Sequence, residues 1–582
     1  MNCLFSSLST AALRTRRSIA PKYLGLFAFT AVCTAAPAAM GAERIYVTYG
    51  PLEESVPIES LALFAKQGKI DSNLDGFAQY IKESQLADIH SALQAKAEIS
   101  QVTIAQFLYT PQGEVLLRRL GRVIQTKARQ PGFYAIRAAL ILAASDPEGL
   151  TILNVLRKFP TYGIRIDIAR ALGIANELTS LINRSNQTIA GVAQLSEAQA
   201  ASEPAIPPAA MLQPQLPGPY TWKKSSVTVT SPNRPRTFDM DIYLPQGSPQ
   251  PAPVVVISHG LGSDRLSFEY LAKHLASYGF AVAVPEHPGS NAQQIQNLVT
   301  GRANEVAEPA EFINRPLDIK DLLDYLTQLS TTNPAYQGQL DLQRVGVIGQ
   351  SFGGYTALAL AGAGINFAQL DKDCGLENDS WNLSLLLQCR ARGLERNQYN
   401  FDDPRIKAVI AINPIVSSIL GETNLSKIQI PVMLIAGSAD TVAPALLEQI
   451  QPFTWLTSPN KYLVLMNNGT HFSTIEDSPQ SLFLPPPEVI GPEPALARRY
   501  LSGLSLAFME SYLNNKSNFR PYLEPSYALS ISRDTLGLRI LRSLTPQQLQ
   551  QFRISPPARR PVSPPVLAPV PLPSPPPIAP VR

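Results

Sequence analysis

The pattern of apolar and polar residues changes near position 218. Residues 44–195 carry apolar positions at helical spacing, separated by turn signals such as Pro131-Gly132. Beyond that point, short continuous apolar runs such as 253–258 alternate with amphipathic stretches such as 268–277. Continuous apolar runs are typical of strands that are buried on both faces of a parallel sheet. The pattern therefore predicts a small α-helical domain followed by an α/β domain, with a mostly parallel sheet and helices on both faces.

Shifts in composition divide the chain further. The N-terminus has a basic cluster, an apolar stretch and then small residues, which is typical of an export signal. We therefore expect an exported protein, whether periplasmic, envelope-associated or secreted, and an uncleaved anchor is the alternative. The predicted division is 1–42 signal peptide, 43–195 α-helical domain, 196–217 Ala/Pro-rich linker, 218–520 catalytic α/β domain with a cap insertion at 364–405, 521–555 C-terminal extension, and 556–582 Pro-rich disordered tail.

The charge distribution argues against a nucleic-acid partner. The whole chain has a net charge of +4, and its first 42 residues, with Arg14, Arg16, Arg17, Lys22 and no acidic residue, account for all of it (4 − 4 = 0 for the rest). No basic patch interleaved with aromatic residues follows. No phosphate-binding loop or metal-ligand cluster stands out either, so we expect no cofactor and no metal.

Candidate chemistry centres on Gly349-Gln350-Ser351-Phe352-Gly353. A short apolar run precedes this G-x-S-x-G motif, and a helical run of small residues follows it. The order strand, motif, helix is typical of a nucleophile elbow, in which two glycines permit a sharp turn that exposes the serine. We therefore predict Ser351 as a nucleophile at the start of a helix. The alternative is an ordinary glycine-rich loop.

A nucleophilic serine needs a base, and His471 is the candidate. The chain has five histidines, and His471 is the one that follows Ser351 in sequence. It comes just after a strand-like run at 462–466. In the order typical of α/β-hydrolases, the base follows the nucleophile and lies in a loop at the end of a strand. We therefore predict His471 as the general base.

The acid that orients the base is predicted to be Asp440. It follows a buried apolar run at 430–436, and its carboxylate would accept the Nδ1 hydrogen of His471 and fix the tautomer. The alternatives Asp402, Asp403 and Glu422 fit less well because none of them closes a strand at its C-terminal end. An aspartate that only caps the next helix is a further interpretation of Asp440.

The loop Ser258-His259-Gly260-Leu261-Gly262 completes the predicted machinery. It follows the buried run at 253–258, where a glycine-rich turn supplies one backbone N–H to an oxyanion, while the residue after the nucleophile supplies the other. These two donors are the amides of Leu261 and Phe352. We expect His259 and His287 to be structural.

These segments, with Glu286-His287 and Gly349–Gly354, resemble the platelet-activating-factor acetylhydrolase family over residues 218–520. The resemblance implies an α/β-hydrolase fold and cleavage of short or oxidised acyl chains from phospholipids. It also implies the same nucleophile, base and oxyanion amides. Gln350 stands where the family usually has histidine. The family's acid position falls near Asn413, so the acid is displaced to Asp440, as in dienelactone- and polyester-hydrolase-like enzymes. The whole chain is similar to bacterial exported hydrolases with an uncharacterised helical N-terminal domain.

Two cysteines remain once an export signal is removed. Cys374 and Cys389 both fall in the insertion after the elbow helix. An even pair in an exported chain favours oxidation. We predict a disulfide that holds the cap over the pocket, and two reduced thiols are the alternative.

Together these features predict an exported serine carboxylester hydrolase that acts on small-molecule or lipid ester substrates. Association with a membrane or envelope surface is left open. Two alternatives remain. One is a binding or scaffold protein with a silent hydrolase domain, and the other is a polyester- or dienelactone-type hydrolase or a peptidase.

Overall fold

The computed structural model describes residues 41–49, 52–79, 81–203, 213–248, 251–375, 380–478 and 487–554. It divides into two compact units, one comprising residues up to Gln101 together with Leu120–Ala169, the other Val102–Arg119 together with residues from Arg170 onward. The predicted signal peptide, apart from its last two residues, and the predicted Pro-rich tail lie outside the described residues. No helix within the described ranges has both the length and the apolarity that a membrane span requires.

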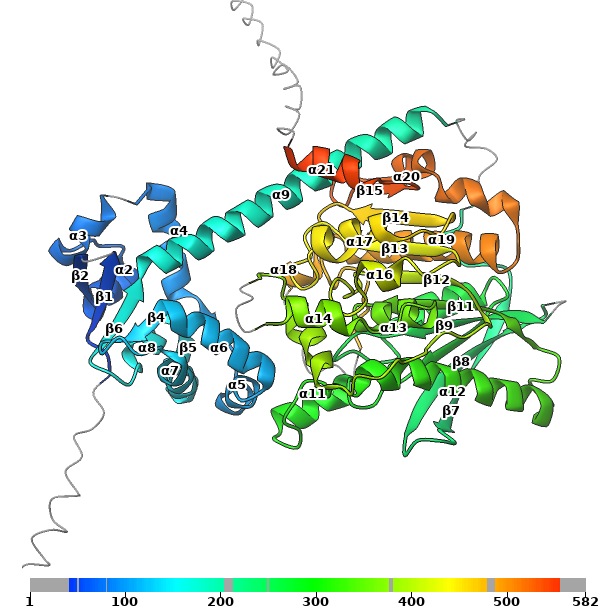
Figure 1. The fold of residues 1–582 in the computed structure, drawn as a ribbon, viewed down its shortest axis with the longest axis horizontal. Helices are drawn as coiled ribbons and strands as arrows, with labels where there is room; N and C mark the ends of the chain where they lie inside the picture. The colour runs from blue at the N-terminus through cyan, green and yellow to red at the C-terminus, as the bar shows by residue number, and fades with distance from the viewer. Residues whose placement is uncertain are drawn as a thin grey trace, which may run out of the picture. The chain divides into compact units, whose positions relative to one another are not determined.

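The first unit contains a four-stranded sheet in the order β2-β1-β6-β4 (Figure 1). Strand β1 pairs antiparallel with β2 and parallel with the distant β6. The strands are β1 (Arg44–Tyr49), β2 (Leu52–Pro57), β4 (Ile124–Thr126) and β6 (Gly163–Asp167), and the helices are α2 (Ile58–Gln67), α3 (Ser72–Ala78), α4 (Glu83–Gln94), α7 (Phe133–Ser145) and α8 (Ile152–Arg157). The predicted all-helical domain is therefore not confirmed. Its short strands pair with partners far away in sequence, and helical periodicity does not indicate such pairing.

Helix α9 (Ile168–Ala201) continues past position 196, where the predicted linker begins. Its buried Ser196 donates a hydrogen bond of 2.9 Å to the carbonyl of Ile540. Ile540 belongs to the edge strand β15 (Leu538–Leu541), so the end of α9 packs on the sheet of the second unit. The alanines that suggested a linker are here strong helix formers on a packed helix.

The second unit is built on a nine-stranded mixed sheet in the order β15-β14-β13-β12-β11-β9-β10-β8-β7. Six central strands run parallel from β10 to β14, while β7, β8 and β15 pair antiparallel at the edges. The predicted α/β sheet is confirmed. The strands are β7 (Thr221–Thr230), β8 (Thr237–Gln246), β9 (Ala252–Ser258), β10 (Ala281–Pro285), β11 (Leu340–Gln350), β12 (Ile406–Ile412), β13 (Val432–Gly437) and β14 (Lys461–Met466).

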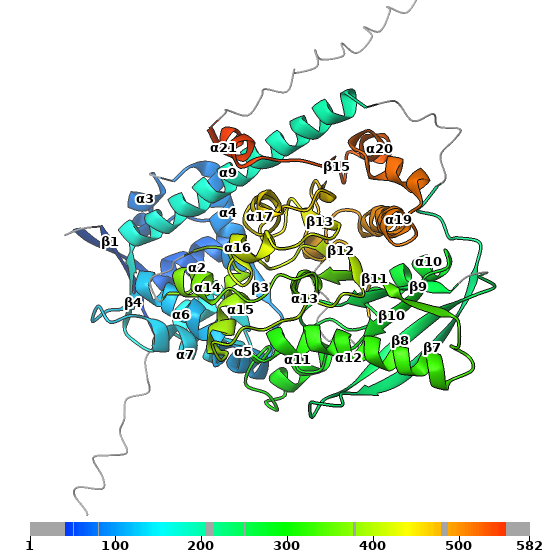
Figure 2. The same cartoon turned by 45° about the vertical axis from the view of Figure 1, so that its right-hand side comes forward.

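Helices cover both faces of this sheet (Figure 2). On one face, α12 (Glu311–Thr332) and α13 (Phe352–Leu360) contribute Phe312 and Tyr355 to a core that includes Val254 and Val256 of β9. On the other face, α10 (Glu269–Ala276) and α19 (Pro494–Tyr512) pack on Val255 and Ile257. Successive side chains of a strand point to opposite faces, so burial on both sides explains the continuous apolar runs of the central strands.

Candidate active site

Ser351 lies at a sharp turn between β11 and α13. Its backbone has φ 54° and ψ −115°, a conformation that costs a non-glycine residue about 1–3 kcal/mol. A Cβ on Gly349 would lie 1.9 Å from the carbonyl oxygen of Gly353, and a Cβ on Gly353 would lie 2.0 Å from that of Ser258. Both positions therefore require glycine, as the elbow motif predicts, and the strained turn places Ser351 at the C-terminal edge of the sheet.

His471 and Asp440 meet at the same edge, in loops that follow β14 and β13. The imidazole Nδ1 of His471 lies 2.7 Å from Oδ2 of Asp440, and because a carboxylate only accepts, Nδ1 is the donor. The other carboxylate oxygen accepts from the amides of Val442 at 2.8 Å and Ala443 at 2.7 Å. Asp440 therefore caps the following turn and also binds the histidine at Nδ1, and no residue in the described part of the chain bonds to Nε2 of His471.

The alternative acids lie elsewhere. Asp403 pairs with Arg405 at 2.6 Å at the start of β12, which is the opposite end of the parallel strands. Glu422 belongs to the short helix α16 (Gly421–Leu425) and is exposed. Among the described acidic residues, Asp440 is the one that bonds the His471 ring.

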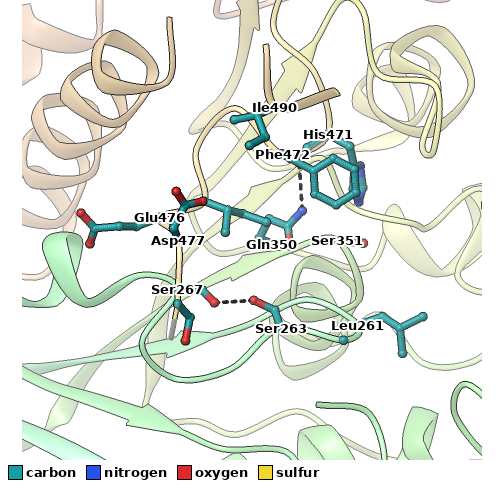
Figure 3. A pocket seen from close by; sticks show the side chains of 13 residues that line it. Leu261, Ser263, Ser267, Gln350, Ser351, His471, Phe472, Glu476, Asp477 and Ile490 are labelled. Atoms are coloured by element: carbon teal, nitrogen blue, oxygen red, sulfur yellow. Dashed lines mark hydrogen bonds between the residues drawn. The ribbon is translucent and has the colours of Figure 1, made fainter. Parts of the chain in front are cut away.

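Ser351 and His471 line one cavity of about 90 Å³ (Figure 3). Its walls combine apolar, hydroxyl and acidic side chains. They come from Leu261, Gly262, Ser263, Ser267, Gln350, Ser351, His471, Phe472, Ile475, Glu476, Asp477, Ser478 and Ile490. No described residue of the predicted cap, 364–405, lines this cavity. The expectation that the insertion covers the pocket stays a prediction.

The turn after β9 brings Leu261 to the rim of this cavity. Gly262, with φ 71°, donates its amide to the carbonyl of Ser290 at 2.8 Å, which fixes the turn. Within the described chain, neither the amide of Leu261 nor that of Phe352 donates to a protein acceptor. Phe352 is the first residue of α13, where a helix leaves its amides unpaired. The two predicted oxyanion donors are thus available.

A network of buried hydrogen bonds stabilises this turn. His259 donates from Nδ1 to the carbonyl of Gly260 at 2.8 Å and accepts at Nε2 from the amide of His287 at 3.0 Å, so it holds the neutral Nδ1–H tautomer. Burial, with the Arg315 cation beside it, lowers the pKa of His259 to about 3. Arg315, fully buried in α12, donates to the carbonyl of His259 and to Ser290 Oγ at 2.8 Å. The two histidines are structural, as expected, and Arg315 is the residue that sequence reasoning missed.

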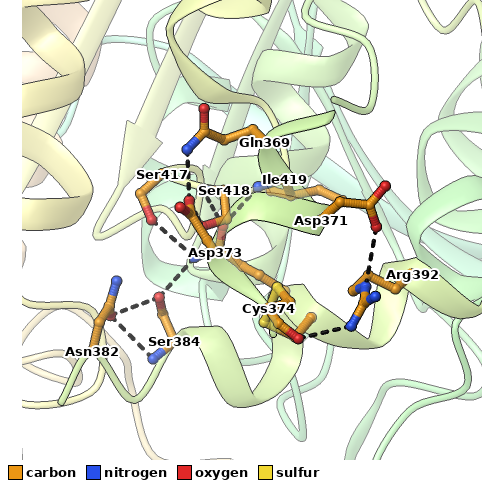
Figure 4. The surroundings of a disulfide bond; sticks show 12 residues. Gln369, Asp371, Asp373, Cys374, Asn382, Ser384, Arg392, Ser417, Ser418 and Ile419 are labelled. Atoms are coloured by element: carbon orange, nitrogen blue, oxygen red, sulfur yellow. Dashed lines mark hydrogen bonds and ion pairs between the residues drawn. A yellow bond between two sulfur atoms is a disulfide. The ribbon is translucent and has the colours of Figure 1, made fainter. Parts of the chain in front are cut away.

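Cys374 and Cys389 form a disulfide across 15 residues (Figure 4). The insertion is anchored by buried Glu448, which lies in the π-helix η3 (Leu446–Ile450) and accepts from Asn382, Ser384, Gln388 and the amides of Val416 and Ser417. Gln388 in turn accepts from the amides of Ser418 and Ile419, both at 2.9 Å. The disulfide segment is therefore packed on the loop that follows β12.

Comparison with known proteins identifies two matching families. Residues 41–167 match the family described as "Alpha/beta hydrolase of unknown function (DUF1400)". Residues 243–320 match "Platelet-activating factor acetylhydrolase, isoform II". The second range contains Leu261 and ends before Ser351.

Curated relatives match at low identity. A platelet-activating factor acetylhydrolase from Canis lupus familiaris is 29% identical over 170 residues, covering 23% of this chain and 36% of that protein. Its counterpart from Cavia porcellus is 27% identical over 161 residues, covering 22% and 35%. Hydrolyase poxO from Penicillium oxalicum is 34% identical over 123 residues, covering 21% and 26%. The chain thus spans about a third of the length of these relatives.

The mixed sheet with helices on both faces is an α/β fold, and the matched segments are similar to families of hydrolases. The similarity of the chain to platelet-activating factor acetylhydrolases is real but distant, and it is confined to a fraction of each chain.

Proposed function

We propose that the protein is an exported serine carboxylester hydrolase with Ser351 as nucleophile, His471 as general base and Asp440 as the acid that orients the base. The observation that carries this proposal is the 2.7 Å bond from His471 to Asp440 beside a cavity that Ser351 also lines. The strained backbone of Ser351 adds support, because such strain is concentrated at active sites. The disulfide fits an oxidising compartment outside the cytoplasm.

The proposed reaction runs through an acyl-enzyme. Nε2 of His471 takes the proton of the Ser351 hydroxyl while Oγ bonds to the ester carbonyl carbon. The amides of Leu261 and Phe352 donate to the oxyanion that forms. His471 then protonates the departing alcohol as the carbon–oxygen bond breaks. Water, deprotonated by His471, attacks the acyl group in the same way, and the carboxylic acid leaves with Ser351 restored.

The apolar part of the cavity suits the acyl chain of an ester. Leu261, Phe472 and Ile490 supply apolar walls for such a chain. The matches to platelet-activating factor acetylhydrolases favour esters of short acyl chains on lipid-like alcohols.

The proposal is tested with p-nitrophenyl esters from acetyl to octanoyl, alongside phospholipids that carry either an acetyl or a long acyl chain at the second position. We expect kcat/KM to be highest for the shortest acyl groups. A fluorophosphonate probe should label the protein, and Ser351→Ala should abolish labelling. A folded protein that neither reacts with the probe nor hydrolyses any ester would instead favour a binding or scaffold role.

A further inference from the structure

Asn413 lies between the two loops that carry Asp440 and His471. It directly follows β12, with φ 43°, and its side chain is 3% exposed. Its Oδ1 accepts from the amide of Gly437 at 2.9 Å, at the end of β13. Its Nδ2 donates to the carbonyls of Thr470 at 3.1 Å and His471 at 3.3 Å. One amide group therefore spans both loops.

Gln350 adds a second restraint on the same carbonyl. Its Nε2 donates to the carbonyl of His471 at 3.1 Å, as Figure 3 shows. The side chain is 2% exposed, so water does not compete for this bond. The elbow is also tied to the residue before Asn413, because the amide of Ser351 donates to the carbonyl of Ile412 at 2.8 Å. The His471 carbonyl is thus held from the elbow and from Asn413 at once.

The contacts of Asn413 require an amide. Gly437 presents a donor, while Thr470 and His471 present acceptors, so the side chain must accept on one side and donate on the other. An ionised aspartate has no donor and would set a negative charge against two carbonyl oxygens. An apolar residue would leave the buried backbone groups unpaired, which is costly. Asparagine also tolerates the positive φ better than most residues.

We propose that Asn413 is a positioning residue for the reaction, which sets the distance between the Asp440 turn and the His471 backbone, with Gln350 as its partner. The proposal rests on the proposed hydrolase function. Asn413 does not line the cavity, so it acts through His471 rather than on the substrate. Asn413, from the loop after β12, thus holds an acid–base pair whose acid comes from the loop after β13 and whose base comes from the loop after β14.

The test compares Asn413→Asp with a matched control, Asn424→Asp. Asn424 is also buried and away from the cavity; its Nδ2 donates to the carbonyl of Gly364 at 2.6 Å, and its Oδ1 accepts from Nζ of Lys427 at 2.7 Å. Because a misplacement of about 1 Å can cost about 10²-fold in rate, we expect Asn413→Asp to lower kcat for p-nitrophenyl acetate by about 10- to 100-fold. KM should stay within about 3-fold, since no substrate contact is lost. Asn424→Asp also replaces a buried amide donor by a carboxylate, here opposite Lys427, and should leave kcat unchanged.

A spectroscopic measurement separates positioning from general loss of structure. The proton shared by His471 and Asp440 should give a far-downfield proton NMR signal. We expect Asn413→Asp to shift or broaden that signal and Asn424→Asp to leave it in place. If Asn413→Asp does not fold, Gln350→Met removes the second donor to the His471 carbonyl and should lower kcat and shift the same signal; KM is not a readout for this variant, because Gln350 also lines the cavity.

Each outcome decides between the two claims. The positioning role is overturned if folded Asn413→Asp keeps the wild-type kcat. It is also overturned if Asn413→Asp and Asn424→Asp lose kcat equally. Where Asn413→Asp does not fold, a wild-type kcat in Gln350→Met overturns it. Full hydrolysis by Ser351→Ala would instead overturn the hydrolase mechanism itself.

Discussion

The second unit holds two groups of serine, histidine and aspartate. The cavity group is Ser351, His471 and Asp440. The buried group is Ser258, His287 and Asp318. In the buried group, Nε2 of the histidine lies 3.0 Å from the serine hydroxyl and Nδ1 lies 3.1 Å from the carboxylate. All three of its residues are at most 1% exposed, and none of them lines the cavity.

The comparison shows that three hydrogen-bonded side chains are not sufficient for a catalytic site. His287 is fully buried, and burial, with the Arg315 cation nearby, keeps its pKa well below the usual range. It therefore cannot take up a proton near neutral pH. The carboxylate of Asp318 is already committed to Arg234 and Arg236. The cavity group differs in that Ser351 and His471 line a cavity, the serine is strained and, among the described residues, the amides of Leu261 and Phe352 have no acceptor; its proposed catalytic role rests on these features.

Replacing the two serines should give the largest contrast. We expect Ser351→Ala to lower kcat/KM for p-nitrophenyl acetate by about 10⁴-fold or more, because the nucleophile is lost while folding is retained. Ser258→Ala should leave kcat/KM within about 5-fold and cost about 1–3 kcal/mol of stability, since its hydroxyl belongs to a buried network. Steady-state rates and urea unfolding measure both. A loss of about 10³-fold or more in Ser258→Ala would make the buried group functional.

Replacing the two aspartates should give a contrast of a different kind. Asp440→Asn should lower kcat by about 10³- to 10⁴-fold, because the His471 tautomer is no longer fixed. Asp318→Asn leaves Arg234 and Arg236 without their shared carboxylate, so we expect a loss of about 3–5 kcal/mol in the free energy of unfolding. Activity of the folded fraction should be retained. Near-full activity in Asp440→Asn would show that Asp440 is not the acid that orients His471.

The sequence-based prediction of the cavity group rested on the local pattern of apolar runs. Each of its members follows an apolar run, and the ends of parallel strands meet at one edge of a sheet, so their proximity could be inferred. The mostly parallel sheet followed from the same runs, whereas its edge strand β15 lies in the predicted C-terminal extension and was not predicted. The parallel pairing of β1 with β6, the extent of α9 and the bridging by Asn413 were not predicted, because each depends on contacts between segments far apart in sequence.

Buried histidines outside the cavity also predict that stability depends on pH. Burial lowers the pKa of His259 to about 3 and that of His274, in α10, to about 4. An unfolded histidine has a pKa of about 6.5, so between that pH and about 4 the unfolded chain binds protons that the folded chain excludes. Stability should therefore fall as pH falls through this range.

Each buried histidine contributes up to about 1.4 kcal/mol per pH unit to this slope. Burial raises the pKa of Asp318 to about 6 and raises that of Glu286, and these carboxyls partly oppose the trend because they bind protons in the folded state. Urea midpoints at pH 7 and pH 5 measure the slope. His274→Gln should reduce the difference in bound protons between the unfolded and folded states by about one, and so reduce the slope. A urea midpoint that does not change between the two pH values would contradict the prediction.

The smallest effect on activity is expected from the disulfide. Cys374 and Cys389 lie in an insertion of which no described residue lines the cavity, so breaking the bond should leave catalysis largely intact. Closing a loop of 15 residues stabilises the fold by about 3 kcal/mol in the chain-entropy account. The double variant Cys374→Ser/Cys389→Ser should therefore unfold at lower urea concentration while kcat/KM stays within about 3-fold. Reduction of the wild-type protein should reproduce this result, and reduction of the double variant, as control, should change nothing. A large drop in kcat/KM at unchanged folding would mean that the insertion shapes the site, as the sequence had suggested, through residues beyond those that line the cavity.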